Sequence, residues 1–425
     1  MNDKFILSED KKTIWSLKDR TIRNVVIPNG VIFIESSAFA DCFSLESIEI
    51  PISVTSIGNN AFSGCTFLKN INIPESITTI EDSTFKGCTS MQSIDIPNSV
   101  TSIGNNAFSG CISLKNINIP NSITTIGNSA FNRCVSLQCL DIPNSVISIG
   151  DYAFANCTSL QHIDIPSSVT NMGNCVFEGC SSLKSIDLPE SIKKIGYGLF
   201  RFCHSLQKVG IPNSITVIED AAFNDCISLE SIDIPNSVTT IGEKAFKACS
   251  SLKYISIPNS VTSIGRYIFS HCSSLQSIDL SANLTFIDYD VFYECSSLES
   301  IDIPKNVTSI RNSAFMGCSS LRSINLSHNL ISIGDGAFYG CNSLQIVDIP
   351  NSVTMIEDCA FGRCPLKVIK IRCQKIEEMT VGHFTFTENT IFNDCVLHVP
   401  IGTRWAYKHH PIWGKFKNIE TERFD

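Results

Sequence analysis

Apolar and polar positions recur along this chain in a cycle of 23 residues. Fifteen phenylalanines lie 23 residues apart from Phe39 to Phe361, and a cysteine follows each of them three positions later, from Cys42 to Cys364. A fixed period of roughly 20 to 50 residues is typical of solenoids and propellers, in which one structural unit is stacked many times. We therefore expect one elongated domain, although a chain of 425 residues would ordinarily suggest two or three globular domains.

The first half of each unit predicts a short strand. In the copy at residues 45–67, LESIEIPISVTSIGNNAFSGCTF, the apolar residues Leu45, Ile48 and Ile50 enter the core. Glu49 lies between the two isoleucines and must face outward, because successive side chains of a strand alternate between its two faces. Pro51 removes a backbone donor where pairing should end. Serine replaces this proline at positions 281 and 327.

The second half of each unit predicts another extended segment and a reversal of the chain. Val54 and Ile57 have the spacing of a second inward-facing segment, and Gly58 opens a turn. Residues 59–64 are predicted to form one turn of α or 3-10 helix, with Phe62 as the large core residue between coils. Each coil exposes apolar edges above and below, so only stacking buries them. Burial of each phenylalanine contributes about 2 kcal/mol.

The repeated segments IPNSVTSIGNNAFSGC (residues 96–111) and IPNSVTTIGEKAFKAC (residues 234–249) resemble the 23-residue Treponema-type leucine-rich repeat of BspA-like proteins. The resemblance extends from Ile22 to about Pro365. It implies an α/β repeat, namely a right-handed solenoid with short parallel strands on a concave face, short helical or 3-10 turns, and a cap at both ends. Members of that family are typically cell-surface or secreted proteins, mostly bacterial, which resemble adhesins that bind host proteins or other cells.

The repeat register divides the chain into three parts. Residues 1–21 precede the repeats and predict a hairpin that caps the first coil, residues 22–365 hold fifteen repeats, and residues 366–425 form an enlarged final repeat and a C-terminal cap. The segments at 397–400 and 402–420 resemble the usual ending of the family. All three tryptophans (Trp15, Trp405 and Trp413) lie outside the array, where they suit caps that shield terminal apolar faces.

The charge and the apolar segments limit the class of partner. The formal net charge of −9 and the pI near 5.4 disfavour nucleic acid and acidic membrane surfaces as partners, because both require clustered Lys and Arg. No apolar run is long enough for a membrane span, and the polar start of the chain does not predict a signal peptide. The sequence alone therefore predicts a cytoplasmic monomer, whereas the resemblance implies the cell surface or secretion.

The 20 cysteines do not predict disulfides or metal sites. Fifteen belong to the repeat, and parallel inward side chains do not provide the S–S dihedral angle that a disulfide needs. We expect reduced, buried thiols that act as small apolar residues. The other five contain no C-x-x-C pair, which excludes the usual zinc pattern, and no cofactor is expected. They are Cys139, Cys175, Cys359, Cys373 and Cys395.

The outward position between the two strand isoleucines carries the main candidate site. Nine of its fifteen residues are acidic, and stacking would bring them into one row. The resemblance places this row on the concave face, where it would recognise a basic partner or bind a cation weakly. The predicted partner-binding residues are Glu49, Asp95, Asp141, Asp164, Asp187, Asp233, Tyr254, Asp279, Asp302 and Asp348. Gly210, Ser256 and Tyr254 interrupt the row and would be seats for specific contacts.

A structural interpretation of the same row stays open. Serine often occupies the outward position two residues earlier, as in Ser93 and Ser185, so each carboxylate could accept hydrogen bonds from neighbouring hydroxyls. Duplication of repeats would then have spread the pair. Calcium is disfavoured, because one carboxylate per coil falls short of the six to eight oxygens it takes. Five basic residues between Arg363 and Lys375 would form either a contact patch or a solvated face.

No catalytic motif is present in the sequence. The adjacent pairs Cys203–His204 and His271–Cys272 use cysteines of the buried column, whose neighbours point elsewhere, so they do not predict a nucleophilic dyad. We therefore expect a non-enzymatic scaffold for protein interaction or adhesion that presents an acidic face to a basic or host-derived protein partner. The alternative is a structural spacer or surface-coat element without a specific ligand.

Overall fold

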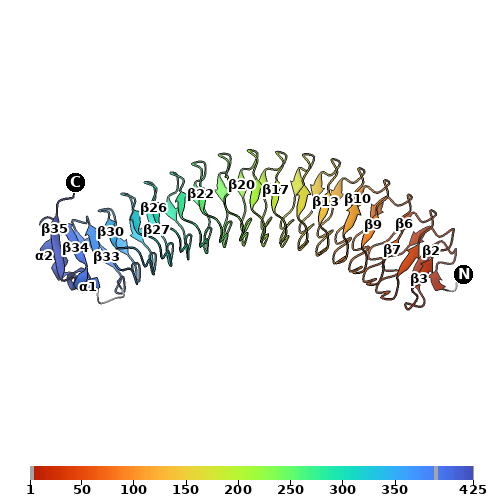
Figure 1. Cartoon of the computed structure of the whole chain (residues 1–425), viewed down its shortest axis with the longest axis horizontal. Coiled ribbons are helices and arrows are strands. Elements are labelled where there is room, and N and C mark those ends of the chain that lie inside the picture. Colours follow the sequence, from red (N-terminus) through yellow and green to blue (C-terminus); the bar gives the residue numbers. More distant parts are fainter. Residues whose placement is uncertain (1–3, 387–390, 425) are drawn as a thin grey trace. The chain divides into compact units, whose positions relative to one another are not determined.

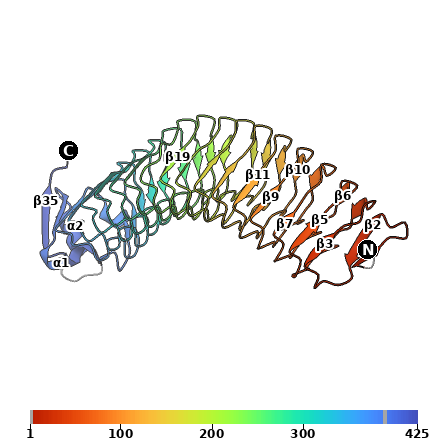
Figure 2. The same ribbon diagram turned by 45° about the vertical axis from the view of Figure 1, so that its right-hand side comes forward.

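A computed structural model describes residues 4–386 and 391–424, and the chain divides into two compact units, Met1–Ser214 and Ile215–Asp425. Each unit is a stack of coils in which short parallel strands lie side by side (Figures 1 and 2). The predicted parallel-strand solenoid is confirmed. Parts of the predicted end segments, residues 1–3, 387–390 and 425, lie outside the described residues.

A coil of the first unit contributes a first strand and a shorter second strand. The first strands are β3 (Asn24–Val26), β5 (Ser47–Glu49), β7 (Asn70–Ile71), β9 (Ser93–Asp95), β11 (Asn116–Asn118), β13 (Cys139–Asp141), β15 (His162–Asp164), β17 (Ser185–Asp187) and β19 (Lys208–Gly210). The second strands are β4 (Phe33–Ile34), β6 (Ser56–Ile57), β8 (Thr79–Ile80), β10 (Ser102–Ile103), β12 (Thr125–Ile126), β14 (Ser148–Ile149), β16 (Asn171–Met172) and β18 (Lys194–Ile195). Before them, β1 (Phe5–Leu7) pairs antiparallel with β2 (Thr13–Leu17).

The second unit repeats this arrangement and ends in short helices. Its first strands are β22 (Tyr254–Ser256), β24 (Ser277–Asp279), β26 (Ser300–Asp302), β28 (Ser323–Asn325), β30 (Ile346–Ile349), β32 (Val368–Ile371), β34 (Val396–Pro400) and β35 (Asn418–Glu422). Its second strands are β20 (Val217–Ile218), β21 (Thr240–Ile241), β23 (Ser263–Ile264), β25 (Phe286–Ile287), β27 (Ser309–Ile310), β29 (Ser332–Ile333), β31 (Met355–Ile356) and β33 (Thr380–Val381). The helices are η2 (Ile376–Glu378), α1 (Ile391–Asp394), α2 (Arg404–His409) and η3 (Trp413–Lys415).

Strand pairing follows the 23-residue period within the repeats, and the interval changes to 22 residues between β30 and β32 and to 25 residues between β31 and β33. In β9 and β11, Ser93 lies opposite Asn116 and Asp95 lies opposite Asn118. Equivalent positions of successive repeats are therefore neighbours in space. Because side chains alternate across a strand, one outward position of the sequence becomes one line of side chains on the surface.

The predicted helical or 3-10 turn in each repeat is wrong. Residues 59–64 form a succession of turns, and no residue of the repeats at 22–365 is helical. Asn60 and Gly64 adopt the left-handed region, with φ of 57° and 74°. These two residues turn alternate amides toward the next coil, where the Phe62 amide donates to the Thr84 carbonyl over 2.9 Å. A ladder between coils thus replaces bonds within a helix.

Stacked phenylalanine rings form the core of each unit. From Phe39 to Phe200 in the first unit, neighbouring ring centroids lie 5.2 to 5.9 Å apart in near-parallel planes. From Phe223 to Phe361 in the second unit, the spacing is 5.1 to 5.8 Å. All these rings are buried. Each adds about 0.5 to 1.5 kcal/mol from ring contact to its burial energy, so the column stabilises every coil interface.

The repeat cysteines do more than fill apolar space, which corrects part of our expectation. The Cys65 thiol donates to the Phe39 carbonyl of the preceding coil, with the sulfur and oxygen 3.1 Å apart, and the bond recurs at most repeat cysteines. All 20 thiols are free. Burial raises the pKa of the Cys111 thiol to about 12. The Phe39 carbonyl already accepts from the Cys42 amide of its own turn, so the Cys65 thiol adds a second hydrogen bond that joins two coils, which an apolar residue could not do.

Polar residues at two further repeat positions also join neighbouring coils. The Ser99 hydroxyl donates to the Ile77 carbonyl over 2.6 Å, and the equivalent serine of most repeats does the same. At the turn, the Asn128 amide donates to the Asn105 side-chain oxygen over 2.8 Å. These side chains satisfy backbone groups that no strand pairs, so the corresponding serine, asparagine and aspartate positions of the repeat are structural.

The glycine after the second strand has a different role from the one predicted. Gly127 does not adopt the left-handed region, but a Cβ at this position would lie 2.6 Å from the Gly104 carbonyl carbon. Real Cβ atoms do not approach backbone so closely. The glycine is required because successive coils come together there, and not because the turn needs its conformational freedom.

We expect Phe131→Ala to lower the free energy of unfolding by about 3 to 5 kcal/mol, because it leaves a cavity inside the ring column. The matched control is Phe67→Ala, since Phe67 is 55% exposed and should cost less than about 0.5 kcal/mol. Urea unfolding followed by circular dichroism measures both. Equal costs for the two variants would contradict the role given to the column.

We expect one thiol of the native protein to react rapidly with a chromogenic disulfide reagent at pH 8. Cys139 is exposed, whereas the repeat cysteines are buried and burial raises their pKa, so few of them are present as thiolate. Cys139→Ser should abolish the fast phase, and all 20 thiols should react in denaturant. Cys359 is partly exposed, but burial raises its pKa, so it should react more slowly than Cys139. A fast phase that persists in Cys139→Ser with Cys359→Ser would show that the column opens readily.

Candidate functional site

The outward side chains of the first strands form the surface on which the sequence placed the candidate site, and we call it the first-strand face. In β9, Ser93 and Asp95 point outward while Ile94 is buried against the core. The same order repeats in β17 and, with Cys139, in β13. The face therefore carries two parallel lines, one mostly hydroxyl or amide and one mostly carboxylate.

The first unit holds five of the predicted residues, all exposed: Glu49, Asp95, Asp141, Asp164 and Asp187. Asp141 lies directly opposite Asp164 in the pairing of β13 with β15, and Asp187 has the same position in the next coil. Strands in a sheet lie about 4.8 Å apart, and two charges at that distance in water repel by about 0.8 kcal/mol. This stretch is the most concentrated negative charge in the row.

Four of these five carboxylates make no hydrogen bond or salt bridge with any other described residue. Asp164 is the exception, because its Oδ1 lies 3.2 Å from His162 Nε2 of the same strand. Serine precedes Glu49, Asp95 and Asp187 by two residues, and the structure shows no hydrogen bond from these three hydroxyls to the carboxylates. The Ser47 hydroxyl donates to Asn24 Oδ1 instead. The carboxylates of Glu49, Asp95, Asp141 and Asp187 remain available as acceptors.

The interruption at Gly210 has a steric explanation. Gly210 lies opposite Asp187 in the pairing of β17 with β19. A Cβ at Gly210 would lie 2.2 Å from Asp187 Oδ1, so the glycine makes room for the carboxylate to lean over the neighbouring strand. The interruption thus positions the last acidic residue of this series, and Gly210 itself offers no side chain for a contact.

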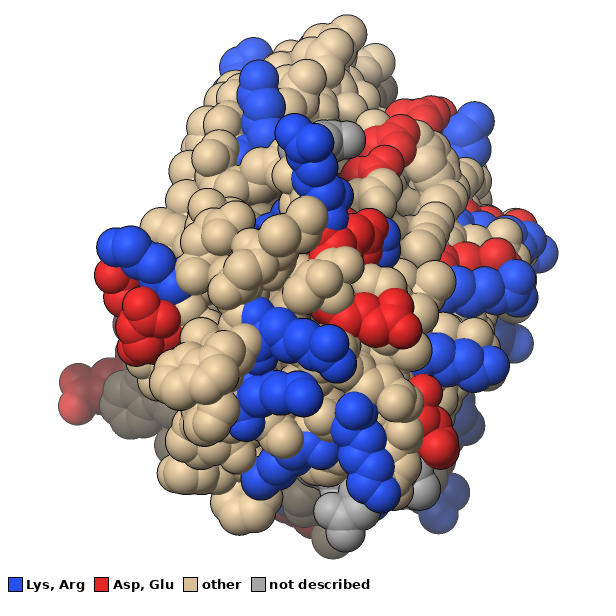
Figure 3. Space-filling view, turned by 90° about the vertical axis from the view of Figure 1, so that its left-hand side faces the viewer, with Lys and Arg blue, Asp and Glu red and all other residues tan. Residues whose placement is uncertain are grey.

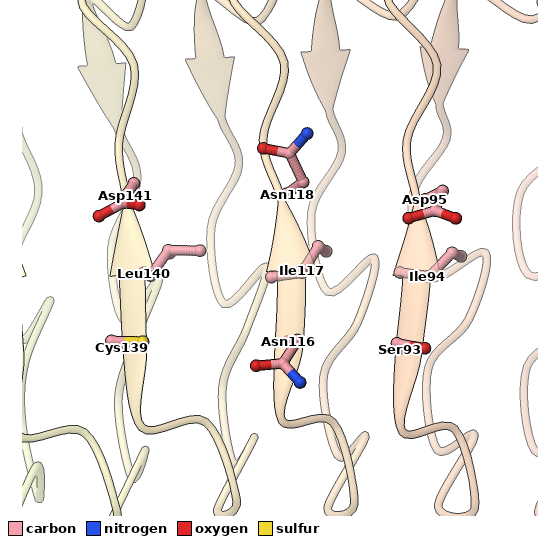
Figure 4. Close-up of a pocket in the computed structure, with 9 residues that line it drawn as sticks. All are labelled: Ser93, Ile94, Asp95, Asn116, Ile117, Asn118, Cys139, Leu140 and Asp141. Carbon is pink, nitrogen blue, oxygen red and sulfur yellow. The ribbon is translucent and has the colours of Figure 1, made fainter.

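Shallow grooves run between the two lines of side chains. One has a volume of about 320 Å³ and is shown in Figure 4. Ser93, Asn116 and Cys139 lie along one margin, Asp95, Asn118 and Asp141 along the other, and Ile94, Ile117 and Leu140 lie between them. A second groove of about 360 Å³ reaches from Ser47 and Glu49 to Asp95. Both are open troughs with polar margins, a shape suited to side chains of a macromolecule.

The second unit carries the other predicted residues, and here most carboxylates have partners. The Tyr254 hydroxyl donates to Asp279 Oδ2 over 2.5 Å, and the Asn325 amide donates to Asp302. Asp348 forms a two-point ion pair with Arg372, at 2.9 and 2.8 Å. Asp233 is exposed, but its segment is not a strand. A groove of about 350 Å³ lies along Asp279 and Asp302.

Two residues of this face were not recognised from the sequence. Cys139 replaces the outward serine of β13, so its thiol is exposed at the margin of the groove. The repeat position of Cys139 could have indicated that its thiol is exposed, because the residue two before the carboxylate faces outward. Asn72 interrupts the acidic row because its side chain pairs with the backbone of Ile50, through bonds of 2.9 and 3.0 Å. The identity of one residue in one repeat does not predict these two hydrogen bonds between Asn72 and Ile50.

Within residues 4–386 and 391–424, no three His, Cys, Asp or Glu side chains are grouped so as to hold a metal ion, and no helix has the length and hydropathy to cross a bilayer. The Cys203 thiol is buried and donates to the Phe177 carbonyl, whereas His204 is exposed. Burial raises the pKa of Cys203, which opposes nucleophilic chemistry there.

Stacked coils of parallel strands with ring and thiol columns define a leucine-rich-repeat solenoid. The family described as the BspA type leucine rich repeat region matches five overlapping segments, residues 16–138, 124–253, 199–322, 239–368 and 308–398. The chain therefore belongs to the BspA-type leucine-rich repeat family, as the sequence resemblance indicated.

Solved structures of bacterial proteins are similar to this chain. A leucine-rich repeat protein of Bacteroides ovatus is 26% identical with a TM-score of 0.61, over 99% of this chain and 98% of that one. A leucine rich cell surface protein of Faecalibacterium prausnitzii is 27% identical with a TM-score of 0.47, over 87% and 94%. The leucine-rich repeat protein of T. pallidum is 34% identical with a TM-score of 0.40, over 43% and 89%. No curated protein matches the chain.

We expect Asp279→Asn to lower the pKa of Tyr254. The hydrogen bond to the Asp279 carboxylate favours the neutral phenol and raises the pKa of Tyr254 above its usual range. Removing the carboxylate should return the pKa toward that of a free tyrosine, as followed by the ring resonances of Tyr254 in a pH titration. Asp302→Asn, which touches a different partner, should leave Tyr254 unchanged. An equal pKa of Tyr254 in both variants would contradict the hydrogen bond between Tyr254 and Asp279.

Proposed function

We propose that this protein is a non-enzymatic scaffold that binds a protein partner through the first-strand face. Leucine-rich repeat proteins commonly serve protein-protein interaction, and stacked repeats provide long surfaces for it. The observation that carries the proposal is the set of carboxylates in the first unit that have no partner. Structural polar residues of this repeat are bonded between coils, whereas these side chains are not.

The partner proposed for this face carries exposed Lys or Arg. The margin formed by Asp95, Asn118 and Asp141 offers hydrogen-bond acceptors and negative charge, which match ammonium and guanidinium groups. Exposed ion pairs of this kind are weak singly and are screened by salt, so binding should depend on several coils together. Family resemblance supports a host-derived partner and an adhesive role.

A location at the cell surface or outside the cell is part of the proposal. Its support is the family resemblance together with the similar Faecalibacterium prausnitzii protein, which is described as a leucine rich cell surface protein. Free thiols throughout the column would fit a reducing compartment better, but burial protects them from oxidation wherever the protein resides.

We propose that the end segments close the apolar ends of the coils. Phe5 of β1 packs edge-on against Phe39, with ring centroids 6.4 Å apart. In the C-terminal segment the buried Trp413 lies 5.6 Å from Phe386, which itself stacks on Phe361 at 6.0 Å. Of the three tryptophans only Trp413 shields the core in this way, because Trp15 is 52% and Trp405 is 73% exposed.

A spacer or surface-coat element remains the second candidate. The shared pattern of the repeats favours it, since copies of one coil extend a structure without requiring any ligand. Such a protein would tolerate substitutions on the first-strand face. The two functions therefore differ in one measurable respect, namely whether these carboxylates are needed for capture of a partner.

We expect Asp141→Asn with Asp187→Asn to weaken capture of a partner about 2- to 30-fold, because each exposed ion pair contributes about 0.2 to 1 kcal/mol. The matched control is Glu9→Gln with Glu75→Gln, which removes two exposed charges elsewhere in the same unit. Affinity capture from cell-surface extracts at low and high salt compares the two. If both variants capture the same proteins as the wild type at both salt concentrations, the spacer is favoured.

A further inference from the structure

Charge is segregated along the chain, and the C-terminal part is basic. Residues 363–425 contain 10 of the 32 Lys and Arg but only 7 of the 41 Asp and Glu. Figure 3 looks onto the C-terminal elements, where Lys and Arg side chains form a broad group with fewer acidic ones among them. The net charge of −9 for the whole chain therefore hides a local excess of positive charge.

Part of this basic surface is already neutralised by neighbours. Lys370 pairs with Glu422 at 2.7 Å, Lys375 with Glu378 at 2.8 Å, and Arg372 with Asp348 at 2.8 Å. Three of the five basic residues that the sequence singled out between Arg363 and Lys375 thus stabilise the structure locally. The solvated or structural interpretation of that stretch is the better one, and a contact surface has to lie elsewhere.

Helix α2 presents cations that have no ion-pair partner within the described ranges. Arg404 and Lys408 are one helical turn apart, so they share one side of the helix, and both are exposed. Trp405 and His409 occupy the adjacent side, with ring centroids 4.2 Å apart. The opposite side holds Tyr407, which is buried and donates to the Cys373 carbonyl over 2.9 Å. The exposed half of α2 is therefore rigidly held.

Two large apolar side chains project beside these cations. Trp405 is 73% exposed, and Ile401, in the turn that leads into α2, is 65% exposed. Gly402, with φ of 88°, and a bond from the Thr403 amide to the Pro400 carbonyl fix that turn. We call Ile401, Arg404, Trp405, Lys408 and His409 the α2 patch. Its apolar members contribute little to the core, so their exposure needs another explanation.

We propose that the α2 patch docks on the anionic phospholipid headgroups of a bilayer surface. Trp is favoured at the level of the headgroups because its ring is apolar and its N–H is polar, and Ile adds apolar area that can enter the acyl boundary. Lys and Arg next to such side chains are attracted by the negative surface potential. Lys415 and Lys417, exposed in and after η3, strengthen the positive potential of this region.

A bilayer fits the patch better than an acidic protein does. The apolar anchors project singly from a short helix and its turn, whereas hot spots of protein interfaces lie in packed pockets with a dry surround. Docking needs no span, so it is consistent with the lack of a membrane-crossing helix among the described residues. The acidic carboxylates of the repeats do not prevent it, since they are screened beyond about 8 Å at physiological salt.

The test is binding of the full chain to vesicles of phosphatidylcholine with about one third phosphatidylserine, measured by co-sedimentation. Each Lys or Arg near an anionic surface strengthens binding about fivefold, so Arg404→Gln with Lys408→Gln should weaken it roughly 25-fold. Trp405→Ala should also weaken binding. In the Trp15→Phe background, Trp405 is the one exposed tryptophan beside the buried Trp413, so the emission should shift to shorter wavelength with anionic vesicles and not with pure phosphatidylcholine. The shift should be absent in Trp15→Phe with Trp405→Phe.

The matched control is Lys69→Gln with Lys115→Gln, which removes two exposed cations of the repeats and should bind as the wild type does. Unchanged thermal melting establishes that each variant is folded. Equal binding by the α2 and control variants would overturn the proposal, as would absence of vesicle binding. Capture of polyglutamate without vesicle binding would assign the patch to an acidic protein instead, and salt-dependent self-association would assign it to a second copy.

Discussion

In-register stacking of 23-residue coils is the constraint on which the rest of this structure depends. Each repeat contributes one phenylalanine ring to the core. Backbone hydrogen bonds join neighbouring coils along the first strands, the second strands and the turns. An isolated coil would expose both faces of its ring and most of its amides, so stability arises from the interfaces between coils. The spacing is set where backbones meet most closely, at the glycines that leave no room for a Cβ.

Polar residues of the repeats fall into two groups, those that form hydrogen bonds between coils and those that face solvent on the first-strand face. Inside and at the corners of a coil, thiols, serines and amides form hydrogen bonds to backbone groups of the neighbouring coil, as Cys65 and Ser99 do. On the first-strand face of the first unit, strand pairing satisfies most of the backbone, so most outward side chains are not needed to bond to it. Asp95 and Asp141 are consequently available for a partner, whereas Asn72 shows that an amide at the same position can bond to backbone.

The net charge of this chain does not predict the partners of its separate surfaces, because the repeats and the C-terminal elements differ in charge. The repeats carry the acidic residues, and the C-terminal elements carry cations that helix α2 displays beside an exposed tryptophan. Two surfaces of opposite sign on one chain suit two different tasks. Recognition of a basic protein by the repeats and attachment to an anionic surface through the α2 patch are compatible, because they use separate residues.

The sequence by itself determined the solenoid, the core and the side from which each carboxylate points. A strict period fixes which residues are equivalent, and alternation within a strand then separates Ile94 from Asp95. The hydrogen-bond ladder of the turns could not be foreseen, because its left-handed residues include bulky side chains such as Tyr267 that rarely adopt that conformation.

Only the tertiary structure decided which polar side chains are free. Asp187 and Asp348 occupy the same repeat position, yet one leans over Gly210 and the other is held by Arg372, which lies 24 residues further along the chain. Likewise, Trp405 and Trp413 both lie in the C-terminal segment within nine residues of each other, but Trp405 is exposed and Trp413 is buried. The residues that contact these side chains belong to neighbouring coils or to the elements at the end of the stack. The sequence of one repeat therefore does not identify them.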